Sequence, residues 1–169
     1  IAGFAFRLYL VQATVFRQTP LNINGDIYDY VMIVDSMFLP TFQPELVSGS
    51  YPLMQPDGTT ALVTEKLAMK LFGTTDCIGR EVTLAVKPSN PETYTGKMWE
   101  NGIYTVAAVV KGWEPHSFFH FQCIVPFSTE EIAERSEEGY WDYYTILRMH
   151  PTANADTVSA LGNKIKPVP

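Results

Sequence analysis

The sequence predicts an α+β fold with about six or seven strands and three helices. Several short segments alternate apolar and polar residues, or are apolar throughout, as β-strands are. The segment ALVTEKLAMKLFGTTDCIGR at residues 61–80 combines a short strand, an amphipathic helix and two glycine turns. The chain of 169 residues is 46% hydrophobic and 18% charged, which is typical of an ordered globular protein.

The N-terminal part is expected to form two strands and a short helical turn. Residues 6–17 alternate well enough for a strand, with one face carrying Tyr9, Val11, Ala13 and Val15. Residues 27–35 are apolar on nearly both faces, which predicts a strand covered from both sides. Residues 22–26 supply the turn between them. Residues 36–42 are expected to form a helical turn that ends at Pro44, with these side chains inward: Phe38, Leu39 and Phe42.

The strongest local signals surround a helix expected at Glu65–Phe72. Thr64 can cap its N-terminus, because the threonine hydroxyl can accept an otherwise unpaired backbone N–H. Gly73 is a natural stop, since glycine readily adopts the left-handed conformation. The buried stripe is expected to comprise Val63, Leu67, Ala68, Leu71 and Phe72, and the outward face Lys66, Met69 and Lys70.

A hairpin and a further strand are expected next. Residues 81–86 and 103–110 are predicted to pair across a long polar connection at 87–102. The following strand is predicted to gather one apolar face from Phe119, Phe121, Cys123, Val125 and Phe127.

The C-terminal part is expected to hold two helices and one strand. Residues 128–131 read as a capping box that starts a short helix ending near Gly139. Residues 141–149 are predicted to form a strand with one face of Trp141, Tyr143, Leu147 and Met149. A closing helix at 155–166 is predicted to turn these residues inward: Val158, Leu161 and Ile165.

Proline and glycine cluster around residues 48–58 and 111–115, which suggests how the chain is divided. The clusters predict a β-rich lobe with one helix at residues 46–115, inserted into an α/β platform made of residues 1–45 and 116–169. The alternative is a single domain over residues 1–169.

Charge and hydropathy exclude some classes of protein. The net charge is −6 without a basic run, so we expect no nucleic-acid partner, because such binding requires a cationic surface. No window of 18 residues is apolar enough for a transmembrane helix, and no signal peptide is recognisable. Since the chain begins at Ile1, we expect it to be a processed product or an excised fragment.

The residue types that usually carry catalysis do not form a convincing group. His116 and His120 have helical metal-ligand spacing but lie in a predicted strand, where they would be about 13 Å apart. Cys123 has no base on its face, and Asp76 would raise the pKa of Cys77. The glycine turn at 73–79 follows a helix and lacks the lysine of a phosphate loop. We therefore predict no enzyme activity, no cofactor and no metal site.

Two surface features remain open. A carboxylate-rich helix face at residues 130–138 is expected to be a solvated surface, with weak divalent-cation binding as the alternative. Trp99, Trp113 and Phe118 fall in loops or on polar faces, so they form a candidate contact surface, with simple packing as the alternative.

Four segments, in this order, resemble the MacB-like periplasmic core domain of ABC transporter permeases, within the FtsX-like group. They are VDSMFLPTF with LVSG, TEKLAMKLFG with DCIGREV, YTVAAVVKGWEPHSFFHFQ, and WDYYTILRMHPTANADTV. The resemblance runs from about residue 34 to 165, and residues 1–30 match only loosely. Cys77 stands where the family usually has proline, and His116 where asparagine is usual. The matching motif residues are Thr64, Glu65, Ala68, Phe72, Gly73, Ile78, Gly79, Tyr104 and Val106.

The resemblance implies a non-catalytic domain on the periplasmic side of a bacterial inner membrane, between the first two transmembrane helices of a dimeric permease. It implies a porter-like α/β platform and a sabre-like β-rich lobe. A cytoplasmic ATPase subunit would drive the movement that this domain transmits. The implied partners are that subunit, a second permease copy, and a periplasmic adaptor, lipoprotein, peptide or cell-wall hydrolase.

Two other functions are weighed against this one. The first alternative is a free-standing extracytoplasmic binding module of the same architecture. The second is an unrecognised hydrolase, which would need a cleft that gathers His116, His120 or the carboxylates of residues 130–138.

Overall fold

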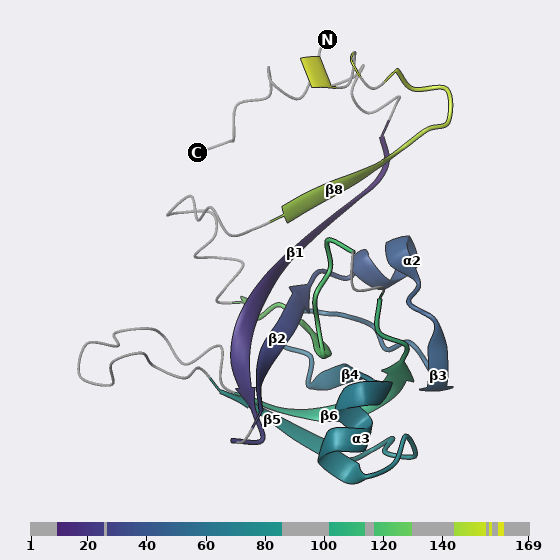
Figure 1. The fold of residues 1–169 in the computed structure, drawn as a ribbon. Coiled ribbons are helices and arrows are strands. Elements are labelled where there is room, and N and C mark those ends of the chain that lie inside the picture. The colour runs from purple at the N-terminus through teal and green to yellow at the C-terminus, as the bar shows by residue number, and fades with distance from the viewer. Residues whose placement is uncertain are drawn as a thin grey trace, which may run out of the picture.

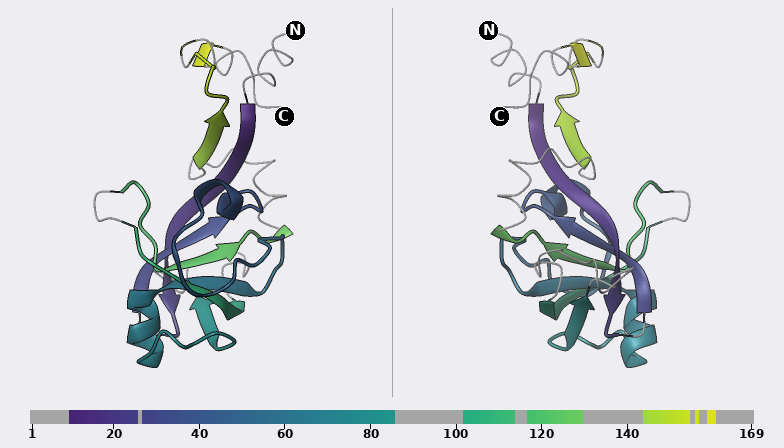
Figure 2. Two further views of the ribbon diagram at one scale, coloured as in Figure 1. Left: turned by 90° about the vertical axis from the view of Figure 1, so that its right-hand side faces the viewer. Right: turned by 90° about the vertical axis from the view of Figure 1, so that its left-hand side faces the viewer.

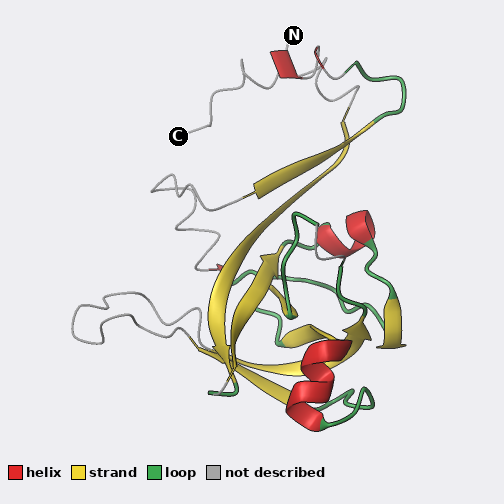
Figure 3. Cartoon of the chain, viewed as in Figure 1, coloured by secondary structure: helices red, strands yellow, loops and turns green. Residues whose placement is uncertain are grey.

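The computed structural model describes residues 10–25, 27–85, 102–113, 117–129, 144–154, 156 and 159–160. Its strands are β1 Leu10–Ile23, β2 Ile27–Val34, β3 Leu46–Gly49, β4 Thr60–Thr64, β5 Glu81–Ala85, β6 Gly102–Val110, β7 Cys123–Pro126 and β8 Tyr144–Met149. The helices α2 Phe38–Phe42 and α3 Glu65–Phe72 accompany them. Strands dominate the described part of the chain (Figure 3), and their mixture with few helices agrees with the predicted α+β class.

The strands belong to one sheet, and most of that sheet closes on itself. Neighbouring strands follow the order β2–β7–β4–β6–β5–β1–β8, and β3 also pairs with β6. Because β1 pairs with β2 as well as with β5, a closed ring results, made of β1, β2, β7, β4, β6 and β5. Closure of this kind leaves fewer strand edges exposed to other chains.

A hydrophobic core fills the ring. One buried cluster takes side chains from every ring strand, which places it on the inside of the closed sheet. Leu67 and Ala68 of α3 join this cluster, so the helix packs against the ring interior. Full burial of each large aliphatic side chain contributes about 1.5–3 kcal/mol to folding. The strand residues of the cluster are Leu21, Ile23, Ile27, Val31, Ile33, Ala61, Val63, Val82, Leu84, Val106, Val109, Cys123 and Val125.

The outer face of the ring carries a second core under α2. Met32 and Val34 alternate with the interior residues of β2, so they point outward and pack with Phe38 of α2. Leu62 of β4 and Ile124 of β7 belong to the same outer cluster. The strand predicted at residues 27–35 is therefore covered from both sides over residues 31–34, whereas Tyr30 is 47% exposed.

The N-terminal half of β1 leaves the ring and forms a two-stranded arm with β8. Residues 10–16 of β1 pair antiparallel with Tyr144–Met149, whereas residues 22–23 pair with β5. Figures 1 and 2 show this arm projecting from the body of the molecule. Leu10 and Met149 are register partners, so the first residue of β1 and the last residue of β8 lie side by side.

The helix predictions are confirmed where the chain is described. The Thr64 hydroxyl accepts the Leu67 N–H at 3.2 Å, and Gly73 ends α3 at φ +68°. Leu67 and Ala68 are buried, while the outward face of the helix is exposed as predicted. Helix α2 is also confirmed, but it ends at Gln43, which adopts φ +45° ahead of Pro44. The hairpin of β5 and β6 is antiparallel, as expected.

Strand β1 is longer than the strand predicted at residues 6–17. It continues through Pro20 to Ile23, because β2 pairs with it over residues 16–23. Proline has no N–H to donate to a neighbouring strand, so it fits where a strand is paired on one side only. At Pro20, β1 is paired with β2 alone. The described side chains of this stretch, Thr14 and Phe16, are buried, while the predicted face of Tyr9, Val11, Ala13 and Val15 lies outside the described side chains.

The strand predicted at 119–127 is shorter and does not keep one face. Only Cys123–Pro126 is a strand, and it runs parallel to β2. Phe119 and Phe121 belong with the outer cluster, whereas Cys123 and Phe127 belong with the inner one. A bend at Gln122 breaks the alternation, so the two halves of the segment turn to opposite sides of the sheet.

The strand predicted at residues 141–149 is confirmed over the described residues Tyr144–Met149. Ile146 is partly buried against the outer cluster, while Leu147 is 36% exposed. The reason is the register with β1, which sets Ile146 opposite the buried Thr14. Several predictions lie outside the described residues: the connection after β5, Trp141, Tyr143, and most of the helices of residues 128–139 and 155–166.

Substitutions at two glycines test the left-handed conformation of Gly73 and the close packing of Gly49. Gly73→Ala is expected to lower the free energy of unfolding by about 1 kcal/mol, because an L-residue is strained at φ +68° but meets no atom within 4 Å. Gly49→Ala is expected to lower it by more, since its Cβ would lie 2.2 Å from the carbonyl oxygen of Ala107. Urea denaturation measures both, with Gly73→Asn as a milder control. Equal losses for the two alanine variants would contradict the close packing of Gly49.

Candidate functional site

Aromatic rings gather where the arm meets the body. Phe16 of β1 is fully buried, with its ring centroid 5.4 Å from that of Tyr144 in β8. The Phe16 centroid lies 5.6 Å from that of Phe38 in α2 and 5.2 Å from that of Phe119. Such pairs each contribute about 0.5–1.5 kcal/mol beyond burial. The ring contacts therefore join the arm, α2 and the segment before β7.

Of the candidate contact residues, Trp113 is packed against other rings, whereas Phe118 is largely exposed. Trp113 is half-buried, with ring centroids of Phe119 at 4.5 Å and Phe121 at 5.2 Å. Phe118 is 56% exposed, although its ring lies 4.9 Å from that of Tyr144. Trp99 lies outside the described residues. A contact surface at Phe118 therefore stays a prediction, and packing accounts for much of Trp113.

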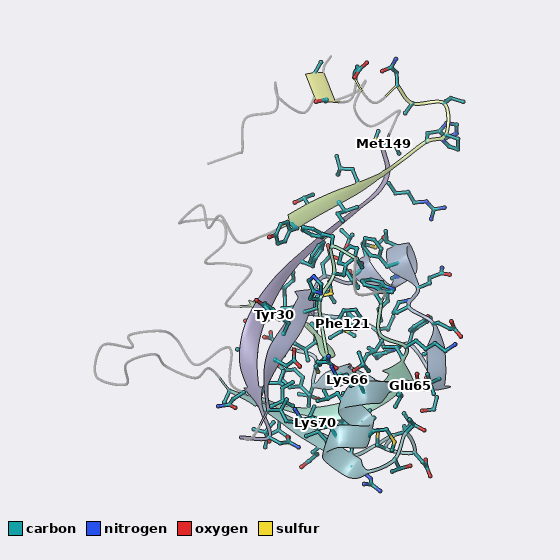
Figure 4. All side chains as sticks on the ribbon, in the orientation of Figure 1. Tyr30, Glu65, Lys66, Lys70, Phe121 and Met149 are labelled. Carbon is teal, nitrogen blue, oxygen red and sulfur yellow. The ribbon has the colours of Figure 1, made fainter. Side chains whose placement is uncertain are left out.

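A pocket of about 440 Å³ adjoins this cluster. Its walls come from β2, the end of β4, the start of α3, and residues 112–113 and 119–122. Figure 4 labels Tyr30, Lys66 and Phe121, which are three of the lining residues. The aromatic lining residues are Tyr30, Trp113, Phe119 and Phe121, and the polar ones are Asp29, Thr64, Lys66, His120 and Gln122.

The floor of the pocket is built around the Thr64 hydroxyl. It accepts the Leu67 N–H and donates to the Gln122 side-chain oxygen, Oε1, at 2.6 Å. The Thr64 backbone N–H also donates to the Gln122 carbonyl at 2.9 Å, and the Gln122 N–H donates to the Tyr30 carbonyl at 2.8 Å. Helix α3, strand β4 and strand β2 thus meet at Gln122.

The other motif residues serve the fold around α3. Ala68 and Val106 are buried in the ring interior, and Phe72 and Tyr104 are packed against it. The Gly79 N–H donates to the Val106 carbonyl at 2.8 Å, with Gly79 at φ +82°. In the same turn, the Arg80 guanidinium lies 5.3 Å from the Phe72 ring centroid. Of the two remaining motif residues, Glu65 is half-buried and Ile78 is exposed.

The cysteines are buried, unpaired thiols. Burial raises the pKa of the Cys123 thiol to about 12. Burial also raises the pKa of Cys77; Arg80 opposes this effect, and Asp76 adds to it as predicted. His120 lines the pocket, whereas His116 and residues 130–138 lie outside the described residues. Within the described ranges, no three His, Cys, Asp or Glu side chains are grouped to hold a metal ion.

The sequence matches the MacB-like periplasmic core domain family over residues 5–163. The chain belongs to this family. Membership makes it an extracytoplasmic domain of the ABC-type permease group. The described part of this MacB-like domain includes no helix that is long and apolar enough to span a membrane.

Solved structures share the fold at low sequence identity. A domain of a protein described as a permease, from Porphyromonas gingivalis, has a TM-score of 0.60 and 16% identity. The match covers 92% of this chain and 64% of that one, so the MacB-like domain spans less than two thirds of the other's length. The extracellular domain of the noncanonic ABC-type transporter YknZ from Gram-positive bacteria has a TM-score of 0.56 and 15% identity, covering 90% and 71%. No curated protein matches the chain.

Sequence reasoning missed the pocket in this MacB-like domain. Asp29, Lys66 and Gln122 are separated along the chain and carry no motif spacing. Lys66 was placed correctly on the outward face of α3, but nothing local indicates that β2 lies next to it. The only local signal was the pair of aromatic residues on either side of His120.

A variant of Thr64 tests the floor of the pocket. Thr64→Val keeps the shape but removes the hydroxyl, so the α3 cap and the Gln122 hydrogen bond are both lost. We expect the free energy of unfolding to fall by about 1–2 kcal/mol in urea denaturation. Thr64→Ser retains the hydroxyl and is the matched control. If the valine variant were as stable as the serine variant, the buried hydroxyl would have no structural role.

Proposed function

We propose that this MacB-like domain passes movement from the transmembrane part of an ABC transporter permease to a substrate or partner outside the membrane, without catalysing a reaction. The main observation in support of this proposal is the two-stranded arm of β1 and β8. A domain inserted between two transmembrane helices needs its two connections close together, and the pairing of Leu10 with Met149 provides such a point.

The attachment of the arm supports transmission of movement. Beyond the stacked rings of Phe16 and Tyr144, the buried Thr14 hydroxyl donates to the Asp35 carboxylate at 2.6 Å. The same carboxylate oxygen accepts the Met37 N–H at 3.0 Å, at the start of α2. A displacement of the arm would therefore be carried to α2 and the ring by packed rings and hydrogen bonds, because such contacts deform little.

For the division into domains, we propose the undivided alternative. Strands β4, β5 and β6 come from the predicted lobe at residues 46–115, yet they complete the ring with β1, β2 and β7. In this proposal the porter-like and sabre-like parts share one core and move together.

The partners follow from the role. We propose a cytoplasmic ATPase subunit and a second permease copy as the moving machinery. A periplasmic adaptor, lipoprotein, peptide or cell-wall hydrolase would be the target on the outside. The alternative of a free-standing binding module keeps one supporting observation, namely the pocket beside Trp113.

Distance measurements in the full-length protein test the transmission. Leu53 is 79% exposed, so Leu53→Cys accepts a spin label, while the buried Cys77 and Cys123 stay unlabelled. With the ATPase subunit present, trapping of nucleotide is expected to change the distance between the two labels of a dimer. Within one chain, the distance from Leu53→Cys to Arg148→Cys on the arm is expected to stay constant. If trapping left the distance between copies unchanged, transmission would be contradicted.

A second prediction concerns the chain alone. We expect ATP and ADP to give no saturable heat in isothermal titration calorimetry, because the ATP-binding subunit is a separate partner in this proposal. The ATPase subunit is the positive control. Stoichiometric binding of nucleotide to the chain would count heavily against the proposed division of roles.

A further inference from the structure

We propose that the pocket lined by Tyr30, Lys66, Trp113 and Gln122 binds a small organic carboxylate that carries a bulky apolar group. This site goes beyond the transmission role and does not depend on it. The inference rests on the apolar wall of the pocket, on the fixed polarity of Gln122 and on the position of Lys66.

The wall of the pocket suits a flat or bulky apolar group. The rings of Trp113 and Phe119 are 4.5 Å apart and tilted by 52°, and Phe121 meets Trp113 edge-on at 5.2 Å. These rings already pack against one another, so a ligand meets a wall that needs little ordering. The volume of about 440 Å³ lies within the range of small-molecule sites, which is roughly 300–1,000 Å³.

The hydrogen bonds of Thr64 determine which atom Gln122 offers to a ligand. The Thr64 oxygen accepts the Leu67 N–H, and its own proton is donated to Oε1 of Gln122. The side-chain oxygen of Gln122 is therefore turned toward Thr64. Its NH₂ group is left for the pocket, where it can only donate.

Lys66 adds a positive charge to the same pocket. It lies in the first turn of α3, where the helix dipole also favours an anion, and its side chain is exposed. It forms no ion pair with any of the described residues. The ammonium of Lys66 and the NH₂ of Gln122 are both donors, so a carboxylate can accept from both.

Asp29 limits the charge of the ligand. One carboxylate oxygen accepts the Tyr30 N–H at 2.8 Å, and the residue lines the same pocket as Lys66. With one cationic and one acidic side chain, the site favours a singly charged carboxylate over a doubly charged phosphate. Asp29 can also accept an N–H from the ligand, which a peptide carboxy terminus has and a simple acid lacks.

Three probes test this chemistry by calorimetry on the chain. N-acetyl-L-phenylalanine has the carboxylate, an aromatic group and an amide N–H. Its neutral amide, N-acetyl-L-phenylalaninamide, lacks the charge, and 3-phenylpropionate lacks the amide. We expect the first probe to bind with a Kd of about 1 mM or below, and the neutral amide to bind about tenfold more weakly. Tighter binding of the first probe than of 3-phenylpropionate assigns the site to peptide carboxy termini, and equal binding assigns it to free small acids.

Matched variants locate the binding. Lys66→Gln is expected to weaken N-acetyl-L-phenylalanine about tenfold, while Lys70→Gln, one turn later on the exposed face of α3, leaves it unchanged. Gln122→Glu keeps an acceptor for the Thr64 hydroxyl but replaces the NH₂ donor by a negative oxygen, so binding should be lost. Absence of saturable binding, or equal effects of the two lysine variants, would overturn the site. Neither result bears on nucleotide-driven movement, which the spin labels report separately.

Discussion

The hydroxyl group of Thr64 is the polar contact on which much of this fold depends. Strand β4 is buried on both faces, so its last residue brings a polar group into an apolar interior. That group is satisfied on both sides, since it caps α3 and donates to Gln122. A buried hydroxyl without such partners would be costly. One side chain therefore sets the start of the helix, the bend before β7 and the polarity of the pocket floor.

The closed ring explains why its strands leave few positions for polar side chains. Strands β2, β4 and β7 have an inner core on one side and an outer core on the other, which accounts for their continuous apolar sequences. Cys123 is buried for the same reason, and its thiol is held neutral by the raised pKa. The arm is the exception, because most of its described β8 side chains are exposed. A stiff body with one projecting pair of strands is a suitable shape for a part that is moved from one end.

The sequence was sufficient where the determining contacts are local. The cap at Thr64, the stop at Gly73 and the buried stripe of α3 each depend on residues within one or two turns, and all were predicted. The two-sided burial of β2 at residues 31–34 was predicted from the apolar residues on both faces of the segment. The ring closure was not, because the pairing of β1 with β5 joins residues about 60 positions apart. The change of face at Gln122 was also missed, since its bend is set by contacts with Tyr30 and Thr64.

The pocket and the arm are connected by shared aromatic rings. Phe119 lines the pocket beside Trp113, and its ring also packs against Phe16, which stacks on Tyr144 of the arm. Any movement of the arm that shifts Phe16 must therefore be accommodated at the pocket wall. The rings that line the pocket therefore also hold the arm against the body, in keeping with a constant distance between arm and body during transmission. Binding and transmission, argued from different residues, thus have a common physical link at Phe119.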